Sequence, residues 1–199
     1  KFDFSVAFDA DMDTGEITVS QFDGNALGAK LDGNFRASAA NTDKLIATGG
    51  ITAEGGDLPT VMAVVGQLQG ADSQTLENLR QALHTSKDKS FSVTADLEAR
   101  MDEESGSLPT IRAKLLGNTI NGEVHVRKIG EDIPAIKGAL DASGPDLPSL
   151  LAIAAQFQSD GKALTRISSQ LAEGSGKHFK IKMRFDTDIQ EGHIEQADF

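Results

Sequence analysis

The sequence contains no cysteine among its 199 residues. Disulfide bonds, zinc sites built on thiolates and thiol nucleophiles are therefore excluded together. The chain also has no excess of basic residues, because 30 Asp and Glu against 19 Lys and Arg give a formal net charge of −11. Such a surface repels phosphate backbones, and no basic stripe with interleaved aromatic residues is present, so we expect no nucleic-acid partner.

Long apolar runs are also missing. A membrane-spanning helix needs about 20 consecutive apolar residues, and no stretch of the sequence comes near that length. The composition, 39% hydrophobic and 25% charged, is ordinary for a globular domain with a buried core. The chain begins at Lys1 rather than at a methionine and ends soon after a new repeat has begun, so we expect it to be part of a longer protein.

The sequence carries an internal repeat. The stretch GDLPTVMAVVGQLQ begins at Gly56, and PDLPSLLAIAAQFQ begins 89 residues later at Pro145. Apolar residues follow at helical spacing in both copies, and Asp57 and Asp146 stand where N-caps are expected. Each stretch therefore predicts the start of a helix. A second helix should follow each one and form an antiparallel hairpin with it. The second helices share three apolar positions, Leu76, Leu79 and Leu83 in the first copy and Leu164, Ile167 and Leu171 in the other.

The rest of the sequence alternates between apolar and polar residues, the period of a strand with one buried face. The clearest runs begin at Phe2, Phe91 and Phe179, and FDADMDTG from Phe8 aligns without a gap with FDTDIQEG from Phe185. Three more strands fit between each run and its helices. They are expected at 16–23, 27–38 and 43–54 in the first repeat and at 107–116, 119–128 and 133–142 in the second.

These patterns predict an α+β fold: a curved, mainly antiparallel sheet from two tandem β4α2 repeats, with helical hairpins packed on its apolar face. The first repeat is expected at 1–88, the second at 89–176, and 177–199 should hold the first strands of a truncated third repeat in one continuous domain. Two short helices cover a smaller area than a sheet of four long strands presents. Either part of the apolar face is open to a ligand or partner, or the sheet curls to close a dry core.

Over nearly its whole length and through both repeats, the chain resembles the AsmA family of bacterial envelope proteins in its order of motifs. AKLLGNTINGEVHV, 113–126, is similar to a strand with a short Gly-rich turn in that family, and IKGALDASGPDLPSLLAIAAQF, 136–157, to a polar-ended strand followed by an Asp-Leu-x-x-Leu-Leu helix start. The helix start is formed here by Asp146, Leu147, Leu150 and Leu151. Its first copy, Asp57, Leu58, Val61 and Met62, departs from the Leu pair but keeps the hydrophobic spacing.

The resemblance implies a periplasmic protein, anchored in the inner membrane by a segment outside this chain, that serves outer-membrane biogenesis or lipid homeostasis. It also implies lipid transport along a β-groove. The expected partners are phospholipid or another acyl-chain ligand, envelope membranes or membrane proteins, and further repeats of the same chain. The alternative is a periplasmic scaffold or assembly factor that binds envelope proteins through exposed strand edges or its apolar face.

On this reading the protein is not an enzyme, and its affinity for acyl chains comes from apolar burial. The residues expected to line the groove are apolar members of the three clearest strand runs: Phe4, Val6, Phe8, Phe91, Val93, Leu97, Ile181, Met183 and Phe185.

No catalytic residue, metal site or cofactor is expected. The acidic run from Asp9 resembles a calcium loop, but its sixth and twelfth positions, Thr14 and Ser20, are not the Gly and acid of an EF-hand. The four histidines form no HExxH pair, and no G-x-S-x-G is present. The basic stretch KHFKIKMR, 177–184, fits a strand face that pairs with an acidic neighbouring strand better than it fits anionic headgroups.

Overall fold

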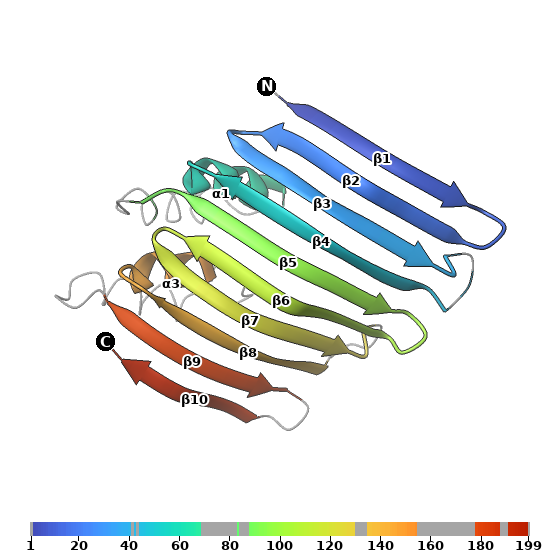
Figure 1. Cartoon of the computed structure of the whole chain (residues 1–199). Helices are drawn as coiled ribbons and strands as arrows, with labels where there is room; N and C mark the ends of the chain where they lie inside the picture. Colours follow the sequence, from blue (N-terminus) through green and yellow to red (C-terminus); the bar gives the residue numbers. More distant parts are fainter. Residues whose placement is uncertain are drawn as a thin grey trace.

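The computed structural model describes residues 2–40, 42, 44–68, 83, 88–129, 135–154, 178–187 and 191–198. Ten strands form one antiparallel sheet in which the order in space is the order in sequence (Figure 1). The strands are β1 Asp3–Asp11, β2 Glu16–Ala26, β3 Ala29–Ser38, β4 Ile46–Gly55, β5 Phe91–Arg100, β6 Ser105–Leu115, β7 Asn118–Arg127, β8 Ala135–Gly144, β9 Phe179–Asp186 and β10 Glu191–Asp198. Helix α1, Leu58–Leu68, follows β4, and helix α3, Leu147–Ala154, follows β8.

The predicted α+β class is wrong. The described chain is nearly all sheet, and its helices are two short elements of 11 and 8 residues rather than hairpins that cover a sheet. At ~1.5 Å per residue they reach only about 16 and 12 Å, whereas ten strands at ~4.8 Å spacing make a sheet about 48 Å wide. The predicted second helices lie outside the described residues, except for Leu83.

The strands lie close to where the two-residue periodicity predicts them. Each group of four strands, β1–β4 and β5–β8, is followed by a helix, α1 or α3, and β9 and β10 complete the described sheet. The repeat boundaries at 88/89 and 176/177 stay predictions.

The strand register separates the sheet into an apolar and a polar face, because residues directly opposite each other in neighbouring strands share a face. One row across all ten strands is Phe4, Gly24, Leu31, Ala53, Val93, Ala113, Ile120, Ala142, Ile181 and Ala197. The adjacent row is Asp3, Asn25, Lys30, Glu54, Ser92, Lys114, Thr119, Ser143, Lys180 and Asp198. The first row is apolar throughout, and the second is polar throughout.

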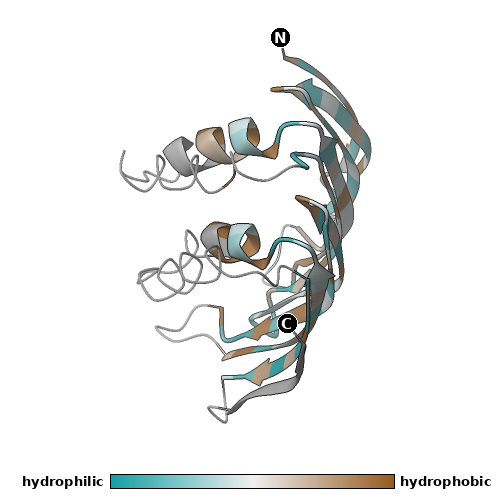
Figure 2. Cartoon of the chain, turned by 90° about the vertical axis from the view of Figure 1, so that its left-hand side faces the viewer, coloured by the Kyte–Doolittle hydropathy of each residue, from teal (hydrophilic) through white to brown (hydrophobic). Residues whose placement is uncertain are grey.

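The sheet is bowed, and both helices project from its concave side (Figure 2). The core lies where the helices meet the strands. Its buried members are Ala29, Leu58, Met62, Leu83, Phe91, Leu116 and Ile153. Ala29 and Phe91 lie opposite Gly55 on its two sides, in the same alternation as the apolar row. The apolar face is therefore the concave face, and the polar face is the convex one.

Glycines on the concave face allow neighbouring strands to approach closely. A Cβ at Gly49 would lie 2.6 Å from the carbonyl oxygen of Asn34, and one at Gly138 would lie 2.5 Å from that of Glu123. Gly49 and Gly138 occupy the same position in the two repeats. Both copies therefore have a glycine where the backbone of the neighbouring strand comes close.

Both helices begin with the same cap. Asp57 accepts hydrogen bonds from the backbone N–H of Thr60 at 3.2 Å and from its hydroxyl at 2.7 Å. Asp146 accepts the same two bonds from Ser149, at 3.2 and 2.8 Å. The Thr60 hydroxyl, and then its N–H, hold the pKa of Asp57 below its ordinary value. The predicted N-caps at Asp57 and Asp146 are confirmed, and they fix where each helix leaves the sheet.

Candidate functional site

The concave face brings together all nine residues predicted to line a groove. Their cross-strand partners are apolar residues of that face. In β1, Phe4, Val6 and Phe8 lie opposite Gly24, Phe22 and Val19. In β5, Phe91, Val93 and Leu97 lie opposite Gly55, Ala53 and Gly49. In β9, Ile181, Met183 and Phe185 lie opposite Ala142, Leu140 and Gly138. Strands far apart in the sequence thus contribute to one continuous apolar surface.

Burial divides the nine residues into three groups. Phe91 is 7% exposed and belongs to the core beneath the helices, so it packs inside the protein. Phe4, Val6 and Phe8 are 57%, 59% and 73% exposed, and Leu97 is 41% exposed. The remaining four are half-buried: Val93, Ile181, Met183 and Phe185. The open part of the concave face is therefore at β1 and at the end of β5 away from the helices.

Further apolar residues of this surface escaped the sequence analysis. Ile51 is 42% exposed and lies on the concave face, opposite Gly33 and Ala95. Met12 and Met101, just after β1 and β5, are 78% and 51% exposed. Ile51 lies in the strand predicted at 43–54, at a position of the alternating pattern that faces the apolar side. The alternation of that strand could therefore have identified it. Burial of one large apolar side chain contributes about 2 kcal/mol, so an apolar ligand or partner that covered these side chains would gain free energy.

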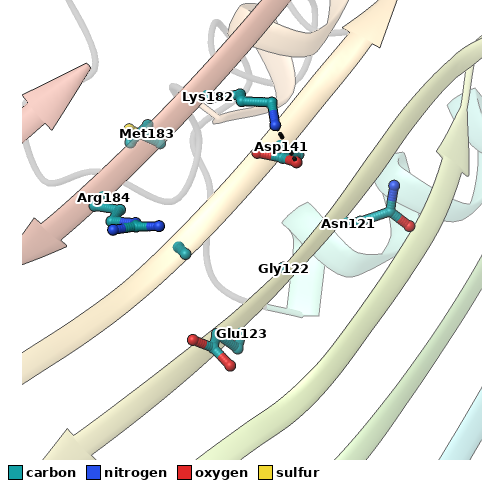
Figure 3. Close-up of a pocket in the computed structure, with 8 residues that line it drawn as sticks. Asn121, Gly122, Glu123, Asp141, Lys182, Met183 and Arg184 are labelled. Atoms are coloured by element: carbon teal, nitrogen blue, oxygen red, sulfur yellow. Dashed lines mark ion pairs between the residues drawn. The ribbon is translucent and has the colours of Figure 1, made fainter. Parts of the chain in front are cut away.

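The convex face is charged and carries exposed ion pairs between strands. The Nζ atom of Lys182 lies 3.6 Å from Oδ2 of Asp141, and that of Lys137 lies 3.6 Å from Oδ2 of Asp186. Figure 3 shows the first pair in a shallow hollow over β7, β8 and β9 that Glu123 and Arg184 also line. The basic stretch at β9 therefore pairs with its neighbouring strand, and exposed pairs of this kind add at most about 1 kcal/mol each.

The acidic run at the β1–β2 turn forms turn contacts. Asp11 accepts hydrogen bonds from the backbone N–H groups of Asp13 at 2.9 Å and Thr14 at 3.2 Å. Thr14, and to a lesser degree Asp13, hold the pKa of the Asp11 carboxyl below its ordinary value. In the described ranges, no group of three or more His, Cys, Asp or Glu could hold a metal ion. No helix within those ranges combines the length and the apolar character needed to cross a membrane.

Asn118 is a polar residue that the sequence analysis missed. Its side chain is fully buried, and its Nδ2 group donates to the carbonyl oxygens of Leu115, Leu116 and Asp146 at 3.0, 3.4 and 3.2 Å. In the first repeat the same position holds Ala29. The signal available in the sequence was that this position is polar in the second repeat and apolar in the first. Asn118 therefore fixes the start of α3 to the sheet and helps to hold this helix on the concave face.

Comparison of the chain with protein-family models, with curated proteins and with solved structures found no match.

Proposed function

We propose that this chain is a non-enzymatic module of the bacterial envelope that holds or guides lipid acyl chains along the concave face of its sheet. The observation that carries the proposal is the continuous apolar row across ten strands, which begins at Phe4, together with the 57–73% exposure of Phe4, Val6 and Phe8 in β1. The described helices lie over one end of the strands and leave these three side chains of β1 uncovered. An acyl chain is the simplest ligand that matches a long surface of aliphatic and aromatic side chains.

Apolar burial can supply the affinity without a polar anchor. Each buried methylene contributes about 0.8 kcal/mol, so a contact of about ten methylenes offers about 8 kcal/mol before the cost of association. The protein side gains as well, because the exposed rings of Phe4 and Phe8 leave water. The ligand would slide along the surface, since the apolar row from Phe4 to Ala197 offers no polar side chain to fix its register.

The cellular setting is proposed from the resemblance to the AsmA family. On this proposal the chain lies in the periplasm and belongs to a protein that is anchored in the inner membrane by a segment outside the chain. Its acyl-chain ligand is phospholipid. The role would be in outer-membrane biogenesis or lipid homeostasis. Envelope membranes or membrane proteins would deliver and accept the lipid.

A scaffold is the second candidate, and the free edge of β1 favours it. Among the described strands β1 pairs only with β2, and all nine of its residues are exposed. An unpaired edge is a template for a strand of another protein. A scaffold would bind an envelope protein through this edge and would carry no lipid.

Native mass spectrometry after purification without detergent from a lysate that contains bacterial membranes separates the two. We expect stoichiometric phospholipid, identified by extraction, on the wild-type chain. Val6→Asp places a charge on the open concave face and should remove the lipid while the chain still folds. The matched control, Ser5→Asp, places the same charge on the convex face one residue away and should retain it. A stable, lipid-free wild-type chain would contradict the proposal.

A further inference from the structure

A phenylalanine recurs at the start of three strands, and its burial differs greatly among the three copies. Phe2, Phe91 and Phe179 are equivalent in the repeat, at offsets of 89 and 88 residues. Phe91 is 7% exposed and Phe179 is 5% exposed, whereas Phe2 is 69% exposed. The two buried copies follow a helix in the chain, and Phe91 packs in a core with Leu58 and Met62 of α1. Phe2 is the copy on which no described helix lies.

The two covered copies sit in the same kind of junction. β4 meets β5 with Gly55 opposite Phe91, and β8 meets β9 with Gly144 opposite Phe179. A Cβ at Gly55 would lie 2.7 Å from the Phe91 ring, so a side chain there would force the ring to move. Small residues lie opposite larger ones at most inward positions of both junctions, and Leu140 opposite Met183 is the exception. The inward positions read Gly49, Ile51, Ala53 and Gly55 in β4, and Gly138, Leu140, Ala142 and Gly144 in β8.

The free edge of β1 presents the same large residues without this partner. Its inward positions are Phe8, Val6, Phe4 and Phe2. Antiparallel pairing in the register of the two existing junctions would place Gly, Ile or Leu, Ala and Gly opposite them. The exposed rings at Phe8 and Phe2 would then each meet a glycine, as Phe185 meets Gly138 in β9.

Charge on the convex face narrows the partner further. In the β8–β9 junction Lys137 lies opposite Asp186, with their charged atoms 3.6 Å apart. The equivalent of Asp186 in β1 is Asp9, for which the described part of the chain provides no ion pair. A strand on this edge that carries a basic residue opposite Asp9 would restore the pair.

We propose that the free edge of β1 binds another strand–helix unit of the kind that β8 and α3 form. The strand has the pattern Gly-x-(Ile/Leu)-x-Ala-x-Gly with a basic residue opposite Asp9, and the helix after it covers Phe2. A second copy of this chain does not supply the unit, because β4 and β8 are already paired on both sides and β10 lacks the pattern. The inference holds whether or not the concave face takes lipid.

The test adds a copy of residues 135–177 directly before Lys1 of the full chain, so that Lys1 takes the place of His178. The sequence has no Trp or Tyr, so Phe2→Trp is a unique fluorescent reporter. We expect its emission to shift to the blue and its quenching by acrylamide to fall toward that of Phe91→Trp in the unextended chain. Amide exchange in β1 should slow at least about tenfold, since its edge becomes paired.

Two variants of the added copy make the test specific. Changing the added Gly138 and Gly144 to Val should return the indole quenching and β1 exchange to the values of the unextended chain. Changing the added Lys137 to Glu should speed β1 exchange roughly two- to fivefold relative to the unmodified extension. An extension that leaves β1 exchange unchanged overturns the proposal. Protection of β1 in the unextended chain that rises with protein concentration also overturns it, because a second copy would then be the partner.

Discussion

Asn118 and Asp146 are joined by two hydrogen bonds that run in opposite directions. The Oδ1 atom of Asn118 accepts from the backbone N–H of Asp146 at 2.9 Å, and its Nδ2 group donates to the carbonyl oxygen of Asp146 at 3.2 Å. The pair closes a contact between the first residue of β7 and the cap of α3, 28 residues apart. It holds the helix at a defined place on the concave face.

Asn118→Ala should lower the free energy of unfolding by about 1–3 kcal/mol, because it leaves backbone groups of Asp146 without their partner in a partly buried site. Urea denaturation followed by circular dichroism measures the change. Asn121→Ala removes the same side chain from an exposed position of the same strand and should stay within about 0.5 kcal/mol of wild type. Equal effects of the two substitutions would contradict this role of Asn118.

Gly138→Ala should destabilise the protein by about 1–3 kcal/mol, since the new Cβ would lie 2.5 Å from the Glu123 carbonyl oxygen and 2.6 Å from the Phe185 ring. Gly50→Ala is the control. Its Cβ would lie 3.5 Å from the Asp96 carboxylate, an ordinary contact, so the change should be neutral or stabilising by about 0.5 kcal/mol. Thermal unfolding of both variants would show whether the close strand approach is confined to the concave face.

Glu104→Gly should stabilise the protein by about 0.5–1 kcal/mol. Glu104 is exposed and has a left-handed φ of 46°, which costs a non-glycine residue about 1–2 kcal/mol, partly offset by the entropy that glycine loses. The equivalent residue of the first repeat is Gly15, with φ of 70°. Asp102→Gly, in the same turn, should destabilise, because it adds the entropy cost without relieving strain. A lower midpoint of urea unfolding for Glu104→Gly would contradict the prediction.

Acid should weaken α1 through its cap. Hydrogen bonds from Thr60 lower the pKa of Asp57 in the folded chain, so its contribution is complete above the unfolded pKa of about 3.9. That contribution is lost as the pH falls through the lower, folded pKa. At pH 7, Asp57→Ala should cost about 1 kcal/mol. The gap between wild type and variant should narrow at pH 3 and below, which unfolding titrations at pH 7, 4 and 2.5 would reveal.

The strands were predictable because their periodicity is local. Phe2, Phe4, Val6 and Phe8 alternate with polar residues, and the strand they predict is present as β1. The same pattern begins at Phe91, yet Phe91 is buried and Phe2 is exposed. Alternation identifies which face a side chain lies on, whereas its burial depends on what lies above that face. The sequence therefore predicted the candidate surface but not which part of it is open.

The fold class was mispredicted for a related reason. The motif after Asp57 and that after Asp146 predict where a helix begins, and both helices begin there. A start signal does not determine how much of a ten-stranded sheet the helix covers, and the short helices α1 and α3 cover one end. Asn118 was missed because its partners are carbonyl groups brought near by the turn at Leu116 and by α3, which no local pattern encodes.

The sequential order of the strands also determines how the chain can fold during its synthesis. Each strand from β2 to β10 pairs with the strand made just before it, although a connection that contains a helix separates β4 from β5 and β8 from β9, so every new strand meets an existing edge. No described strand pairs with a strand that is distant in the order of synthesis. The entropy cost of closing a long loop therefore arises mainly at the two connections that contain the helices. The growing edge moves from β2 to β10 while the edge of β1 keeps its place. Such a protein can lengthen or shorten by whole units over evolutionary time without rebuilding the units that remain.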